Sequence, residues 1–110
     1  MKSYTDLNQS KKLAEILPLK SADMRFCFSH TLGGRITGHY PMIGSEPSLG
    51  TVPCWSLAAL LNVIGNIFKY SLDYNGASFT LIVGDFEITN ETTVDACYRM
   101  ILKLHELNLL

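Results

Sequence analysis

The chain has 110 residues with nine basic and ten acidic side chains, 47% hydrophobic residues and 17% charged residues. That hydrophobic share is normal for a globular domain and excludes a disordered chain, and the length suits one domain. A net charge of −1 does not suit a nucleic-acid binder, and no apolar run is long enough to cross a bilayer. We therefore expect residues 1–110 to form a single globular domain that binds neither nucleic acid nor membrane.

The N-terminal part predicts a helix followed by a strand. Thr5 is a candidate N-cap, an apolar stripe with helical spacing follows it, and Pro18 ends the pattern. These features predict a helix over about 5–17. From Met24 the apolar period changes to two, which predicts a strand with one buried face that includes His30.

The middle of the chain predicts a long loop and then a buried helix. Residues 33–53 are rich in glycine and proline, and within them residues 35–40 are compatible with a short second strand. Pro53 suits the first turn of a helix because its fixed φ is helical and its missing N–H needs no partner. The following segment is apolar almost all round, which predicts a core helix over about 54–66.

Asn75-Gly76 gives the clearest local signal in the chain, because the pair lies between two runs of alternating apolar residues. It predicts a hairpin of residues 68–74 and 77–88 with a two-residue turn. That register places Tyr74 opposite Ala77 and Leu72 opposite Phe79. A β-bulge at Gly84-Asp85 would keep the later apolar side chains on the buried face.

Thr92 or Thr93 is the expected N-cap of a last helix, over about 93–107. Its apolar stripe leaves Arg99 and Lys103 facing outward. The order of elements predicts an α+β fold, with a small antiparallel sheet of three or four strands and three helices packed mainly on one face.

Three separated cysteines, Cys27, Cys54 and Cys97, show no CxxC spacing and argue against a disulfide framework and a zinc site. Residues 1–17 lack the apolar run and cleavage site of a signal peptide. We expect a cytoplasmic protein that needs no metal or other cofactor.

Cys54 is the candidate nucleophile. In the first turn of the predicted helix, the helix dipole would lower the pKa of its thiol and favour the thiolate. The run Pro53-Cys54-Trp55-Ser56-Leu57 resembles the nucleophile segment of papain-type cysteine proteases. It departs from that pattern because it lacks the glycine-rich approach and the oxyanion-hole glutamine. A buried structural cysteine is the alternative.

The three histidines, His30, His39 and His105, share no metal-ligand spacing. His30 on the predicted strand and His39 in the glycine-rich loop are the candidate bases for a cysteine nucleophile, whereas His105 falls on the apolar stripe of the last helix. Asp85 and Glu87 are either an acid–base pair or the solvent-exposed end of a strand.

Residues 4–24, 52–63 and 95–106 carry a resemblance. The patterns Pro-Cys-Trp-Ser-Leu-Ala-Ala-Leu-Leu and Asp-Ala-Cys-Tyr-x-Met-Ile-x-x-Leu-His-Glu stand at Pro53–Leu61 and Asp95–Glu106. They are similar to a group of small uncharacterised proteins from gut anaerobic bacteria and their mobile elements. The resemblance implies one small protein and carries no activity, cofactor or site.

These features lead to three candidate functions. The first is a non-enzymatic interaction or structural module that binds a protein partner or itself, because the low charge is accompanied by apolar leucines at 107, 109 and 110. The alternative is a small cysteine-dependent hydrolase or acyl-transfer enzyme that uses Cys54. A small-ligand binder using the loop 33–53 is the third.

Overall fold

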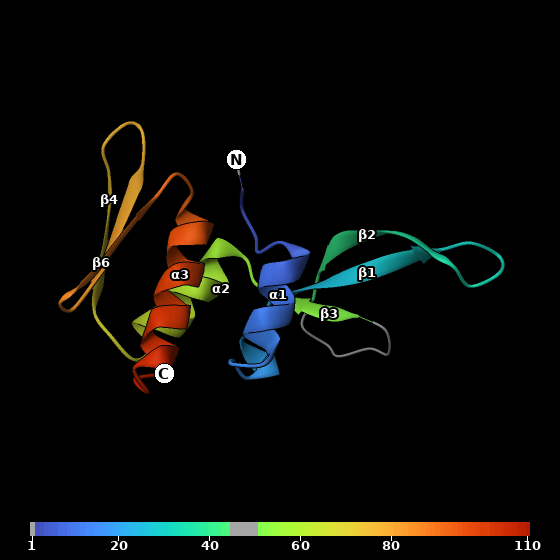
Figure 1. Ribbon diagram of the computed structural model, residues 1–110, viewed down its shortest axis with the longest axis horizontal. Helices are drawn as coiled ribbons and strands as arrows, with labels where there is room; N and C mark the ends of the chain where they lie inside the picture. Colours follow the sequence, from blue (N-terminus) through green and yellow to red (C-terminus); the bar gives the residue numbers. More distant parts are fainter. Residues whose placement is uncertain (1, 45–50) are drawn as a thin grey trace. The chain divides into compact units, whose positions relative to one another are not determined.

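The computed structural model describes residues 2–44 and 51–110 (Figure 1) and confirms the α+β class. Within these residues the strands form two antiparallel sheets of three strands each, in the orders β2-β1-β3 and β4-β5-β6, rather than one sheet. The elements are α1 (Leu7–Ala14), the 3-10 helix η1 (Leu19–Ser21), β1 (Met24–His30), β2 (Ile36–Ile43), β3 (Val52–Cys54), α2 (Leu57–Gly65), β4 (Tyr70–Tyr74), β5 (Phe79–Val83), β6 (Phe86–Asn90) and α3 (Thr93–Glu106).

The chain divides into two compact units. One comprises residues Asp6–Trp55, and the other combines the residues up to Thr5 with Ser56–Leu110. The first unit holds α1 with β1, β2 and β3, and the second holds α2 and α3 with β4, β5 and β6. The prediction of one globular domain stays a prediction. No helix in the described part of the chain combines the length and apolar character needed to cross a membrane.

Helix α1 begins two residues later than predicted, because Asp6 rather than Thr5 is its N-cap. The Asp6 carboxylate accepts a 2.8 Å hydrogen bond from the Gln9 N–H, and the Gln9 side chain accepts one of 3.1 Å from the Asp6 N–H. This reciprocal pair satisfies two of the donors that a helix leaves unpaired at its start. Beyond Ala14 the chain continues as a turn in which the Leu17 N–H donates to Leu13 at 2.8 Å.

In the sheet β2-β1-β3, strand β3 pairs only with the first residues of β1, Met24–Phe26. The remainder of β1 pairs with β2 alone, and the two strands extend past β3 as a hairpin (Figure 1). Phe26 is buried, whereas His30 is exposed. The prediction of a buried His30 is therefore wrong, because burial on β1 ends close to where the third strand ends.

Pro41 closes one position on the open edge of β2. The Gly44 N–H donates to the Asp23 carbonyl at 2.9 Å, so odd-numbered residues of β1 bond to β2. Bonded and non-bonded pairs alternate in an antiparallel ladder, which makes Phe26 and Pro41 a non-bonded pair. The Pro41 nitrogen, which has no hydrogen, therefore faces the open side of the sheet.

Helix α2 begins at Leu57, three residues later than predicted, because Ser56 is its N-cap and its hydroxyl accepts from the Ala59 N–H at 3.2 Å. Pro53 lies in β3 instead. The helix is also not buried on every side. Leu60 and Ile64 are buried on one side, where α2 contacts α3, while Ala58 is exposed.

The hairpin of β4 and β5 keeps the predicted faces but not the predicted register. Tyr74 pairs with Phe79 and Leu72 with Leu81, a shift of two residues. The cause is the Asn75 side chain, whose oxygen accepts from the N–H groups of Ala77 and Ser78 at 2.9 and 2.8 Å and thereby makes a four-residue loop. An even shift leaves every side chain on its original face.

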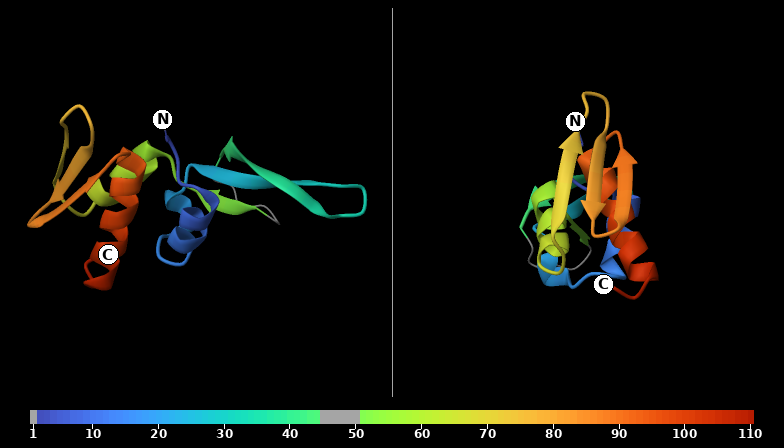
Figure 2. Two further views of the ribbon diagram at one scale, coloured as in Figure 1. Left: turned by 45° about the horizontal axis from the view of Figure 1, so that its top comes forward. Right: turned by 90° about the vertical axis from the view of Figure 1, so that its left-hand side faces the viewer.

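Gly84 and Asp85 form a turn rather than the predicted β-bulge. Val83 pairs directly with Phe86, so the chain reverses and Phe86–Asn90 becomes the separate strand β6. Gly84 has a φ of 59°, the left-handed conformation that such two-residue turns need at their first position. Strands β4, β5 and β6 lie side by side in one layer with α3 behind them (Figure 2).

Helix α3 runs from Thr93 to Glu106 with Thr92 as its N-cap. Its last turn closes as a Schellman motif: the N–H of Leu109 donates to Leu104 at 2.9 Å and that of Asn108 donates to His105 at 3.0 Å. Asn108 accordingly has a φ of 58°. The helix packs against α2, β5 and β6, and its buried apolar residues are Val94, Ala96, Cys97, Met100, Ile101 and Leu104.

Candidate functional site

Cys54 does not lie at a helix N-terminus. It is the last residue of β3, pairs with Met24 of β1, and is fully buried. Since α2 begins only at Leu57, the helix dipole does not act on the Cys54 thiol in the way that the sequence suggested. These features match the alternative of a small apolar core residue.

The candidate bases lie far from this thiol. Cys54 stands opposite Met24 of β1, while His39 stands opposite Phe28, four residues further along the same strand. At about 3.3 Å per residue, that is about 13 Å along the sheet before the width of β1 is added. His30 lies further still along β1. Hydrogen bonding between either histidine and Cys54 is thus excluded by the register.

His39 packs against aromatic rings instead of a nucleophile. Its ring lies edge-on to Phe26 with the centroids 5.3 Å apart, and 6.4 Å from the Phe28 ring. His105 is exposed, and its Nδ1 lies 3.4 Å from the Leu110 carbonyl oxygen. Within residues 2–44 and 51–110, no group of three His, Cys, Asp or Glu side chains is arranged to hold a metal ion.

Asp85 and Glu87 do not share a strand face. Asp85 belongs to the turn between β5 and β6, whereas Glu87 lies on β6, and both are exposed. The structure therefore places neither carboxylate in a shielded site, as the alternative of a solvent-exposed strand end requires.

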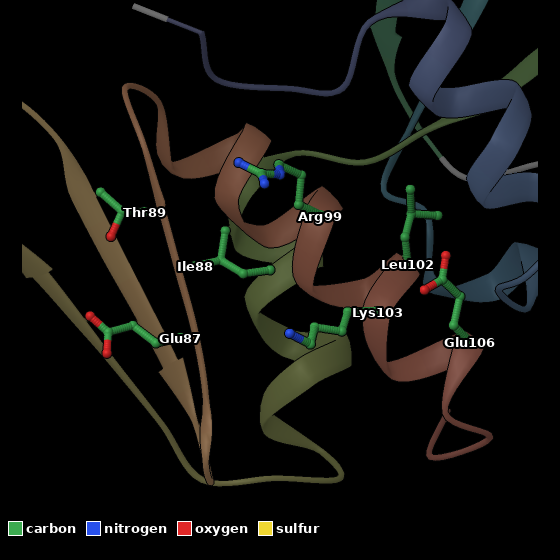
Figure 3. Close-up of a pocket in the computed structure, with 7 residues that line it drawn as sticks. All are labelled: Glu87, Ile88, Thr89, Arg99, Leu102, Lys103 and Glu106. Carbon is green, nitrogen blue, oxygen red and sulfur yellow. The ribbon is translucent and has the colours of Figure 1, made fainter.

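A groove runs along β6 and α3 and is the candidate site that the sequence did not reveal (Figure 3). It encloses about 490 Å³. Its walls come from two consecutive elements, β6 and α3. The lining residues are Glu87, Ile88, Thr89, Arg99, Leu102, Lys103 and Glu106.

Strand β6 offers backbone groups to this groove. It is an edge strand, since β5 lies on one side of it and no described strand lies on the other. The two-residue turn makes Val83 and Phe86 a hydrogen-bonded pair. Because hydrogen-bonded and non-hydrogen-bonded pairs alternate along an antiparallel ladder, Glu87 and Thr89 form no backbone hydrogen bonds to β5. The N–H and C=O groups of Glu87 and Thr89 therefore point to the open edge.

The helix wall of the groove carries two cations, Arg99 and Lys103, both exposed. The Lys103 ammonium lies over the Phe86 ring, 5.3 Å from its centroid. In Figure 3 both side chains extend from α3 toward β6, and Ile88 points back toward the helix. Glu87 and Thr89 point to the opposite side of the strand. The groove thus combines an open strand edge with a positively charged helix face.

Comparisons with protein-family models, with curated proteins and with solved structures found no match for this chain.

Proposed function

We propose that the protein is a non-enzymatic interaction module that binds a partner by adding a strand to the open edge of β6. The observation that supports this function best is that the backbone N–H and C=O groups of Glu87 and Thr89, which do not bond to β5, lie in a groove whose other wall is α3. In such binding, main-chain hydrogen bonds supply affinity and the neighbouring side chains supply specificity.

The edge of β6 is suited to this role. An edge strand is commonly blocked by proline, a bulge or a covering element. Strand β6, Phe86–Asn90, contains no proline, and its pairing with β5 is regular over all five residues. By contrast, the edge strand β2 has Pro41 facing its open side. The β6 edge is thus unprotected and lies beside the groove, and the edge strand β4, Tyr70–Tyr74, likewise contains no proline.

The test uses phage-displayed 12-residue peptides selected on the intact protein. Thr89→Pro removes the outward N–H without touching a bond to β5, and Thr89→Val is the matched control that loses the same hydroxyl but keeps the N–H. Selected peptides are expected to bind wild type and Thr89→Val equally and to lose at least about tenfold in affinity for Thr89→Pro. Failure to select any peptide, or equal binding to all three proteins, would contradict the proposal.

Self-association belongs to the same proposal and is supported by a different surface. The β1–β2 hairpin exposes large apolar side chains, with Ile43 86% and Ile36 59% exposed, and Leu32 is fully exposed at its turn. Exposed apolar groups gathered on one element favour association. Sedimentation velocity over a concentration series is expected to reveal a dimer that Ile36→Ser with Ile43→Ser weakens. A strict monomer at high concentration would remove this part of the proposal.

The alternative of a cysteine-dependent hydrolase is supported less well, because the Cys54 thiol is fully buried and lies far from His30 and His39. We also propose a cytoplasmic location. All three cysteines of the chain are free thiols, as a reducing compartment would keep them.

A further inference from the structure

The two cations of the groove are one helical turn apart. Arg99 and Lys103 lie four residues apart on α3, which corresponds to about 6 Å of rise along the helix. Both side chains extend toward β6 (Figure 3) and line the groove together with Glu87 and Thr89. Any strand added to the open edge of β6 would run past both of them.

The side-chain spacing of an added strand matches the spacing of the two cations. Successive side chains of a strand point to opposite faces, so residues i and i+2 share a face and lie about 6.6–6.8 Å apart. On β6 the helix-facing side is that of Ile88 (Figure 3). Two carboxylates at i and i+2 of the partner strand, on that same side, would match the spacing of Arg99 and Lys103 to within about 1 Å.

The charge balance of the groove favours an acidic partner. Within the described residues, the Arg99 guanidinium makes no ion pair or hydrogen bond, and the Lys103 ammonium contacts only the face of Phe86. In the part of the chain that the structure describes, neither groove carboxylate, Glu87 or Glu106, forms an ion pair with them. In Figure 3 Glu87 points to the opposite side of β6, and Glu106 lies beside Leu102, farther from β6 than either cation.

We infer that the partner strand is an acidic peptide of the pattern Asp/Glu-x-Asp/Glu, bound along β6 with its two carboxylates on Arg99 and Lys103. This inference rests on the proposed strand addition and adds the identity of the ligand. The main chain would bond to Glu87 and Thr89, and the paired carboxylates would fix the register of the peptide. Arginine and lysine are both suited to this arrangement, because each donates charge-assisted hydrogen bonds to carboxylates.

The experiment measures binding of fluorescent ten-residue peptides by anisotropy. One peptide carries Glu-x-Glu in a β-forming sequence, a second carries Gln-x-Gln, and a third carries the two glutamates at adjacent positions, which places them on opposite faces. The Glu-x-Glu peptide is expected to bind about tenfold more tightly than the other two, and its affinity should fall as salt rises.

Variants of the protein assign the effect to the two cations. Arg99→Gln and Lys103→Gln are each expected to weaken the Glu-x-Glu peptide about three- to tenfold and to leave the Gln-x-Gln peptide unchanged. Lys11→Gln, which removes an exposed charge from α1, is the charge-matched control and should change the affinity of neither peptide. The charge-reversed variant Arg99→Glu with Lys103→Glu should prefer a Lys-x-Lys peptide.

The outcomes separate this inference from the proposed function. If all three peptides bind equally and Thr89→Pro abolishes their binding, strand addition stands and the acidic pattern is wrong. If binding of the Glu-x-Glu peptide does not respond to Thr89→Pro, the strand-addition function itself is wrong. If no peptide binds, both are overturned.

Discussion

The indole Nε1 of Trp55 donates a 3.0 Å hydrogen bond to the hydroxyl of Ser21, which in turn donates to the Pro18 carbonyl at 2.6 Å. Trp55 follows β3, and Ser21 ends the 3-10 helix η1, so the chain of bonds ties two segments of one unit together. The indole is fully buried. Its N–H therefore needs a partner inside the protein.

Ser21→Ala is expected to destabilise the protein by about 1–3 kcal/mol, because it removes the hydroxyl that accepts from a buried donor. Trp55 is the only tryptophan in the chain, so urea unfolding followed by its fluorescence measures the change directly. In a Trp55→Phe background, where unfolding is followed by circular dichroism because no tryptophan remains, the same substitution should cost clearly less, since no indole N–H is left to satisfy. Equal costs in both backgrounds would contradict the assigned hydrogen bond.

The cysteines are expected to differ in alkylation rate in the native protein. Cys27 is partly exposed, whereas Cys54 and Cys97 are buried. Cys27 should react first with iodoacetamide, and the other two only as the protein opens or unfolds. Mass spectrometry of the digested protein assigns each site. Rapid alkylation of native Cys54 below about pH 7 would instead indicate an activated thiolate and support the hydrolase alternative.

Stability is expected to fall at alkaline pH through Cys97. Burial raises the pKa of its thiol from 9.0 to about 12. Below pH 9 the thiol is protonated in both the folded and the unfolded states and adds no pH dependence. Between pH 9 and about 12 the unfolded chain loses this proton while the folded protein keeps it, so the free energy of unfolding decreases as the pH rises.

Denaturant unfolding of wild type and of Cys97→Ala at a series of pH values isolates this effect. The variant loses a constant amount of stability from the missing sulfur. The stability advantage of wild type over the variant should shrink above pH 9, the ordinary value of the thiol pKa. A constant difference across that range would show that Cys97 ionises alike in both states.

Pro41→Thr is expected to increase association between copies of the protein. The substitution places an N–H on the open side of β2, between the outward-facing groups of His39 and Ile43. An unblocked edge strand is a template for pairing with another chain. Sedimentation velocity measures the increase. Tyr40→Thr is the control, because the Tyr40 N–H already faces β1 and the edge is unchanged.

The faces of the hairpin were predictable and its register was not. Leu72, Leu81 and Ile88 share a face in the structure as the alternating pattern requires. A shift of two residues and the replacement of a bulge by a turn both preserve that parity. The pattern of apolar residues therefore cannot distinguish these arrangements, and the side-chain hydrogen bonds of Asn75 decide between them.

The helix wall of the groove could be predicted from the sequence, but the strand wall could not. The helical spacing placed Arg99 and Lys103 outward, as they are in α3. The open edge beside them is not predicted by the sequence, because the apolar alternation past Val83, with a β-bulge at Gly84-Asp85, favours one continuous strand. Likewise, His30 has the correct spacing for a buried face, but its burial depends on whether a distant segment, β3, extends far enough to cover it.

The division of the chain has a consequence for the order of synthesis. Residues Asp6–Trp55 form one unit, but the segment before them belongs to the other, where Tyr4 bridges to Ser56 and Lys2 pairs with Asp95 at 2.7 Å. On the ribosome the Asp6–Trp55 unit is complete while α3 is still unmade. The two anchors of the N-terminal segment therefore become available at different times: Ser56, the partner of Tyr4, is made soon after the Asp6–Trp55 unit, whereas the Lys2–Asp95 ion pair can form only once α3 has begun to emerge.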